Sequence, residues 1–102
     1  MLRIGLFCAG GMSTSMLMEA MKESARKKGL EVDINAYPVA SINTKATEND
    51  VVLLGPQIGY QFEDVKKFCD KHHIPSAVIP MTDYGRMNGK AVLNQALKLL
   101  EK

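Results

Sequence analysis

The pattern of hydrophobic and polar positions divides the chain into alternating strand-like and helix-like segments. Apolar residues alternate with others at positions 2–6, which predicts a β-strand. Residues 31–37 alternate in the same way and predict a half-buried or edge strand. Residues 50–55 form a continuous apolar run, which is typical of a central parallel strand covered on both faces. A fourth short strand is predicted at residues 77–79, between two prolines.

Helical periodicity occupies most of the segments between these strands. Apolar or small residues recur at spacings of three and four from about residue 16 to residue 28, over residues 62–72 and over residues 92–100. Residues 39–48 are weakly patterned and predict a short helix or turn. Residues 81–89 predict a loop.

This order of elements predicts a single α/β domain over residues 1–102. Strands that alternate with helices form a parallel sheet with helices on both faces. Right-handed crossovers leave few arrangements of four strands, and the flavodoxin-like order 2-1-3-4 is the most economical. In such sheets, ligands bind at the carboxyl ends of the strands, near the change in winding direction. The first strand ends beside that point.

The segment that follows the first strand has the composition of an anion site. Its residues are Cys8, Ala9, Gly10, Gly11, Met12, Ser13, Thr14 and Ser15. The backbone N–H groups of such a loop can converge on an anion, and the first turn of the next helix adds unpaired N–H groups and a positive dipole end. These donors stabilise a thiolate. We therefore predict that Cys8 is a nucleophile for a phosphoryl group, which the residues from Ala9 to Ser15 bind.

Several residues of interest also have a purely structural interpretation. Hydroxyl residues before a helix can act as N-caps alone. Cys69 shares an apolar helical face with Phe68 and is expected to be a small buried hydrophobe. His72 and His73 point about 100° apart on a helix, which indicates a solvated helix end rather than a metal site. Asp83 could be a general acid, but a turn-forming aspartate is the more common case.

Composition and charge exclude other classes of partner. The 102 residues include 13 Lys and Arg and 11 Asp and Glu, for a net charge of +2 at pH 7. This charge is too small to indicate nucleic acid or an anionic membrane as partner. No stretch approaches the roughly 18 apolar residues of a membrane span. No signal peptide is visible, so we expect a cytoplasmic monomer with two thiols rather than a disulfide.

Two motifs and a final dipeptide resemble those of a known family. The segment from Cys8 to Ser15, followed by residues 52–58 (Val-Leu-Leu-Gly-Pro-Gln-Ile) and by Tyr84-Gly85, resembles the IIB component of the bacterial sugar phosphotransferase system, of the lactose, cellobiose and chitobiose type. The likeness extends over nearly the whole chain. Gly10 departs from it, because alanine is more usual there; glycine should loosen the loop without removing a donor.

The resemblance implies a phosphoryl relay. Cys8 would accept a phosphoryl group from a phosphohistidine on a IIA protein and pass it to a sugar bound by the membrane IIC protein. The implied acceptors are disaccharides such as cellobiose, chitobiose or lactose. The backbone N–H groups from Ala9 to Ser15 would hold the phosphoryl oxygens. No metal or organic cofactor is implied. We expect the partners to dock on a rim formed by Met12, Gln57 and Tyr84.

Two alternatives remain open from the sequence. Low-molecular-weight tyrosine phosphatases and arsenate reductases also place a cysteine loop between a first strand and helix. Their loop has an arginine six positions after the cysteine, where this chain has Thr14. Without a guanidinium on the phosphoryl group, hydrolysis should be slow, which suits a relay. The other alternative, a non-enzymatic flavodoxin-like binder of an anion or nucleotide, leaves Cys8 without a role.

Overall fold

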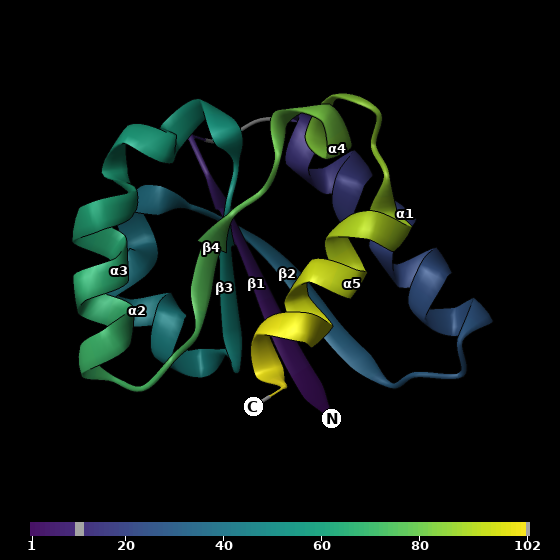
Figure 1. The fold of residues 1–102 in the computed structure, drawn as a ribbon, viewed down its shortest axis with the longest axis horizontal. Coiled ribbons are helices and arrows are strands. Elements are labelled where there is room, and N and C mark those ends of the chain that lie inside the picture. Colours follow the sequence, from purple (N-terminus) through teal and green to yellow (C-terminus); the bar gives the residue numbers. More distant parts are fainter. Residues whose placement is uncertain (10–11, 102) are drawn as a thin grey trace.

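A computed structural model shows four parallel strands in one sheet, in the order β2-β1-β3-β4 (Figure 1). It describes residues 1–9 and 12–101, apart from the side chains of Met12 and Ser13. The strands are Leu2–Cys8 (β1), Val32–Pro38 (β2), Val51–Leu54 (β3) and Ser76–Val78 (β4). The predicted α/β class and the predicted strand order are both confirmed.

The register places the end of β1 inside the sheet. β1 pairs with β2 as far as Cys8 opposite Pro38, and with β3 as far as Phe7 opposite Leu54. β1 therefore has a neighbour on each side almost to its last residue. All four residues of β3 are buried, as predicted for a strand covered on both faces, and β2 lies at an edge of the sheet, also as predicted.

Helices cover both faces of the sheet. In Figure 1, α1 and α5 lie together on one side of the strands, and α2 and α3 lie on the other. The α-helices are Met12–Lys27 (α1), Ile42–Lys45 (α2), Phe62–Lys71 (α3), Met81–Gly85 (α4) and Gly89–Leu100 (α5). Short 3-10 helices occupy Val39–Ser41 (η1), Ala46–Glu48 (η2) and Pro56–Gln61 (η3). The short helical segment predicted over residues 39–48 is thus confirmed.

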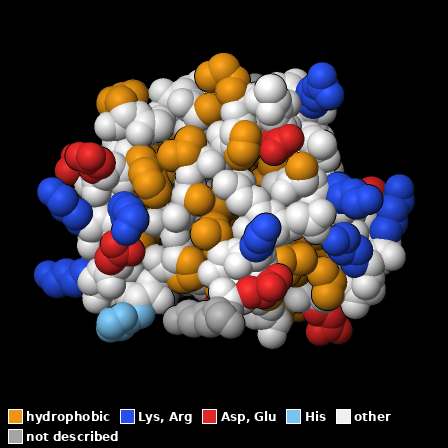
Figure 2. All heavy atoms as spheres, viewed as in Figure 1, with side chains coloured by type: hydrophobic (Ala, Val, Ile, Leu, Met, Phe, Trp, Pro, Cys, Tyr) orange, Lys and Arg blue, Asp and Glu red, His pale blue; other side chains and the backbone are white. Residues whose placement is uncertain are grey.

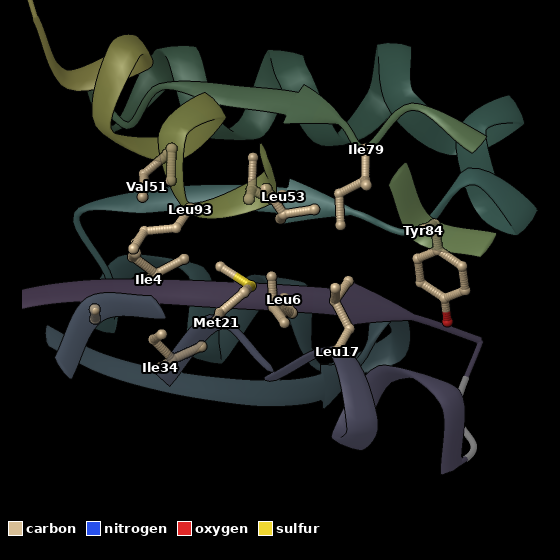
Figure 3. Packing of buried hydrophobic residues seen from close by; sticks show 13 residues of the cluster. Ile4, Leu6, Leu17, Met21, Ile34, Val51, Leu53, Ile79, Tyr84 and Leu93 are labelled. Carbon is tan, nitrogen blue, oxygen red and sulfur yellow. The ribbon is translucent and has the colours of Figure 1, made fainter. Parts of the chain in front are cut away.

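The two faces of the sheet have separate hydrophobic cores, because successive side chains of a strand point to opposite faces. Ile4 and Leu6 of β1 point toward α1 and α5 and pack with Met21 in what we call the first core (Figure 3). Phe7 belongs to the other core, which we call the second core and which lies beneath α3. The Phe7 ring stacks on Tyr37, with ring centroids 5.0 Å apart. Each such fully buried side chain contributes about 1.5–3 kcal/mol to the free energy of unfolding.

One glycine sets the distance between the helices of the first core. A Cβ atom placed on Gly89, the first residue of α5, would lie 2.3 Å from the carbonyl carbon of Ala20 in α1. No side chain fits in that space. The absence of a side chain at Gly89 therefore allows α5 to begin directly against the backbone of α1.

Two of the predicted boundaries are wrong. Helix α1 begins at Met12 rather than near residue 16, and residues 81–89 include the helix α4 rather than only a loop. Hydroxyl residues are poor helix formers in a helix interior but are well suited to a first turn, so periodicity does not detect this start. The turn of α4 is closed by a hydrogen bond from Tyr84 N to Pro80 O, and Tyr84 anchors it in the first core.

Over the ranges 1–9 and 12–101, no helix combines the length and the apolar character that a membrane span requires. Cys8 and Cys69 are thiols and do not form a disulfide, as predicted.

Candidate functional site

Cys8 is the last residue of β1, at the carboxyl edge of the sheet. Its side chain is buried, with 6% of its surface exposed. Helix α1 begins four residues later, so its first turn, whose N–H groups have no acceptor within the helix, lies at the same edge. The positive end of the helix dipole is thereby directed to the end of the sheet at which Cys8 lies.

Thr14 contacts the sulfur directly. Its Oγ1 donates a hydrogen bond to Sγ of Cys8 at 2.7 Å, and only 3% of the Thr14 surface is exposed. Ser15, the next hydroxyl residue, is exposed. The sequence did not distinguish the roles of the three hydroxyls. The structure assigns a contact with Cys8 to Thr14, at the position where the phosphatase loop would have arginine.

Tyr84 lies beside Thr14, although 70 residues separate them in the sequence. The Thr14 Oγ1 and Tyr84 Oη atoms are 3.1 Å apart. The Tyr84 ring belongs to the first core (Figure 3), and its hydroxyl reaches Thr14. The ring is not on the rim where the sequence analysis placed it, because only 7% of the residue is exposed. The packing of α4 turns the side chain inward.

Gly55 is the point at which the other site residues meet. A Cβ atom placed on it would lie 3.4 Å from Cβ of Cys8, 3.7 Å from Cε2 of Tyr84 and 3.1 Å from Oε1 of Gln57. Gln57 itself is exposed, so it has the surface position expected of it. Residues that follow β1, β3 and β4 therefore converge on one small region, as the fold predicts for a site.

Part of the predicted phosphate-binding loop lies outside the described residues. This applies to Gly10 and Gly11 entirely and to the side chains of Met12 and Ser13. The described part of the loop has Ala9 exposed at the end of β1 and the backbone of Met12 and Ser13 in the first turn of α1.

The other candidate residues lie away from Cys8. His72 and His73 follow α3 and line a pocket with Arg3 and Asp50, at the amino-terminal end of the strands. No cluster of three or more possible metal ligands occurs in the part of the chain that the structure describes. Cys69 is fully buried in the second core, as predicted, and burial raises the pKa of its thiol.

Three exposed apolar side chains were not predicted from the sequence. Met16, Tyr60 and Met81 are 60%, 82% and 68% exposed, and they belong to α1, η3 and α4. Each of these elements follows the carboxyl end of a strand. Figure 2 shows hydrophobic side chains along the upper edge of the molecule, where η3 and α4 lie in Figure 1. Large apolar residues within the segments that follow strand ends were the available signal. We call these three residues the apolar rim.

Comparison with known proteins identifies the family. The family described as "PTS system, Lactose/Cellobiose specific IIB subunit" matches residues 3–95. The chain belongs to this IIB family. It is therefore a component of a phosphotransferase system, as the resemblance of its motifs implied.

Individual relatives of this IIB protein differ in the sugar that their names give. The galactose-specific EIIB component of Lactococcus lactis subsp. cremoris (strain MG1363) is 39% identical, over 95% of this chain and 94% of the relative. The solution structure of a cellobiose-specific phosphotransferase IIB component from Borrelia burgdorferi is 34% identical, with a TM-score of 0.80, over 96% of this chain and 90% of that chain. A more distant relative, the lactose-specific EIICB component of Lactococcus lactis subsp. lactis, is 30% identical over 65% of this chain but only 12% of its own length.

Proposed function

We propose that Cys8 of this IIB protein carries a phosphoryl group from a IIA component to a sugar bound by a membrane IIC component. The observation that supports this most directly is the hydrogen bond from Thr14 Oγ1 to the sulfur of Cys8 at the end of β1, an inner strand of the sheet. A donor at 2.7 Å stabilises negative charge on sulfur, and the thiolate is the nucleophilic form of cysteine.

Two displacements at phosphorus make up the relay. In the first, the thiolate of Cys8 attacks the phosphorus of a phosphohistidine, so that a P–S bond forms while the P–N bond breaks and the imidazole leaves. In the second, a sugar hydroxyl attacks the same phosphorus. An O–P bond forms, the P–S bond breaks, and the sulfur leaves as thiolate while the hydroxyl proton passes to solvent or a base of the acceptor complex. Backbone N–H groups from Ala9 to Ser15 hold the phosphoryl oxygens in both steps.

The same site argues against the phosphatase alternative. Thr14 stands where those enzymes have arginine, and it is a neutral donor buried against the sulfur. A neutral hydroxyl stabilises the charge of a hydrolytic transition state less than a bidentate guanidinium does. The phosphocysteine therefore lasts long enough to meet its acceptor. The flavodoxin-like binder is also disfavoured, because it gives no role to a thiol that is hydrogen-bonded at the strand end.

The partners and the sugar follow from the family. One relative is named as an EIICB component, which supports a IIC protein as the acceptor complex for this chain. Cellobiose and lactose, which are disaccharides, appear in two of the relatives' names and galactose in a third. Together with the resemblance of the motifs, the first two names support a disaccharide such as cellobiose, chitobiose or lactose, selected by IIC. The chain acts as a cytoplasmic monomer, and no metal or cofactor takes part. Partners dock on the apolar rim together with Met12 and Gln57.

Transfer from a phosphorylated IIA protein tests the proposal. Intact-protein mass should show one added phosphoryl group in the wild type and in Cys69→Ala, and none in Cys8→Ser. Cys69 is the matched control because it is also a buried thiol. Phosphorylation of Cys8→Ser, or rapid hydrolysis of p-nitrophenyl phosphate by the wild type, would contradict the relay.

A further inference from the structure

The hydroxyls of Tyr84 and Thr14 and the sulfur of Cys8 form a hydrogen-bonded chain with a defined direction. A threonine hydroxyl has a single proton to donate. Because Thr14 donates that proton to Cys8 at 2.7 Å, its 3.1 Å contact with Tyr84 must be one in which Tyr84 donates and Thr14 accepts. The chain therefore runs from the Tyr84 O–H through the Thr14 O–H to the sulfur.

All three residues are nearly inaccessible to water, with 7%, 3% and 6% of their surfaces exposed. Hydrogen bonds are stronger in such an environment, and consecutive hydrogen bonds polarise one another. Donation from Tyr84 makes the Thr14 proton a better donor. It also prevents Thr14 from turning its proton toward the Tyr84 oxygen, since that rotation would leave the sulfur without this bond.

The ring and the hydroxyl of Tyr84 serve different purposes. The ring packs with the first core beneath α1 and α5, a task that phenylalanine would perform equally well. The hydroxyl reaches the Thr14 hydroxyl, which touches Cys8. Because Tyr84 comes from α4 and Thr14 from α1, the contact also couples the position of α4 to that of the sulfur.

We propose that Tyr84 is a positioning residue for the reaction of Cys8, acting through Thr14. It holds the Thr14 proton on the sulfur, which stabilises the thiolate before attack and again when the thiolate leaves. Once the sulfur is phosphorylated, Thr14 can turn its proton to a phosphoryl oxygen while it still accepts from Tyr84. The role in transfer rests on the proposed function, whereas the effect on the thiolate does not.

Alkylation of Cys8 tests the proposal without any phosphoryl donor. We would measure the rate of reaction with iodoacetamide against pH in a Cys69→Ala background, together with thiolate absorbance. Tyr84→Phe should move the pH profile to higher pH and slow alkylation near pH 7 by roughly 3- to 10-fold, the range for loss of one hydrogen bond. Thr14→Val should slow it at least as much, and Thr14→Ser should restore nearly the wild-type profile.

The double variant separates this role from a merely structural one. If Tyr84 acts only through Thr14, then Cys8 of the double variant Thr14→Val, Tyr84→Phe should be alkylated no more slowly than Cys8 of Thr14→Val alone. The proposal would be overturned if the two substitutions slowed alkylation independently, so that their effects on the rate multiplied. It would also be overturned if the pH dependence of alkylation in Tyr84→Phe matched that of the wild type. If the alkylation results hold but phosphoryl transfer to Cys8 fails, the relay is wrong and the role of Tyr84 stands. Thermal unfolding of each variant verifies that it is folded. If Tyr84→Phe does not fold, the comparison of Thr14→Ser with Thr14→Val still tests the hydrogen bonds to Cys8.

Discussion

Gly55 lies directly against Cys8, across the carboxyl ends of β3 and β1. A Cβ atom on Gly55 would be 3.4 Å from Cβ of Cys8 and 3.1 Å from Oε1 of Gln57. The first contact is an ordinary one and the second is tight. A methyl group at Gly55 would therefore push Gln57 aside and fill the space next to Cys8, while the core beneath remains packed.

Gly55→Ala should slow phosphorylation of Cys8 more than it lowers stability. Gln57 must move by a few tenths of an ångström, so we expect a loss of roughly 10-fold in rate, less than the ~100-fold that a 1 Å misplacement can cost. The measurement is the initial rate of transfer from phosphorylated IIA. Gly59→Ala is the matched control, because among the described residues beyond its own neighbours its Cβ would meet only Val78 Cγ1, at 3.7 Å. Equal rates for the two variants would contradict the prediction.

Gly89→Ala should destabilise the whole domain. The added Cβ would lie 2.3 Å from the Ala20 carbonyl carbon, and backbone atoms cannot rotate away as a side chain can. We expect the free energy of unfolding to fall by about 3 kcal/mol or more, at the upper end of the range for overpacking. Urea denaturation measures this. Gly85→Ala, where the added Cβ would meet no atom of the described residues within 4 Å outside its own turn of helix, should change stability by less than about 1 kcal/mol. A similar loss in both variants would show that α5 does not depend on the Gly89 contact.

The apolar rim should contribute to partner affinity and not to the chemistry of the thiol. Replacing Met16, Tyr60 and Met81 together by serine should raise the KM for phosphorylated IIA by roughly 10-fold or more, because buried interface side chains often contribute over about 1 kcal/mol each. The alkylation rate of Cys8 should not change. Leu30→Ser provides the control, since Leu30 is an exposed apolar residue just beyond the other end of α1. An unchanged KM would remove the rim from the docking surface.

Cys69 should make the folded state more sensitive to alkali. Burial, with a smaller contribution from the charge of Asp70, raises the pKa of the Cys69 thiol above its ordinary value of 9.0, against a lowering effect of the Ser76 hydroxyl. The folded protein therefore holds this proton more tightly than the unfolded chain does. The resulting contribution to stability is complete below pH 9 and declines as the pH rises through the higher, folded-state pKa.

The comparison of wild type with Cys69→Ala isolates this effect from other alkaline titrations. At pH 7 the variant should be less stable by about 1 kcal/mol, because it loses a buried sulfur. Urea midpoints at pH 7 and pH 10 should show that the difference between the two proteins narrows as the pH rises. A difference that stays constant would mean that Cys69 does not lose its proton more easily on unfolding.

Much of the fold could be predicted because the long elements have clear periodicities. The continuous apolar run of β3 and the alternation of β2 distinguished a central strand from an edge strand. The start of α1 and the helix α4 could not be predicted. Each involves only about one turn, and a single turn has too few residues for a periodic pattern, so tertiary packing determines whether it forms.

The sequence alone determined that a thiol ends the first strand, that glycines and hydroxyls follow it, and that the candidate site lies at this edge of a parallel sheet. Local periodicity and element order contain that information. Only the tertiary structure decided that the Thr14 hydroxyl touches Cys8. It also decided that Tyr84 contacts Thr14 from within the core and does not lie on the surface with Gln57. A contact across 70 residues depends on how α4 and α1 pack over the sheet, and the periodicity of neither segment specifies that packing.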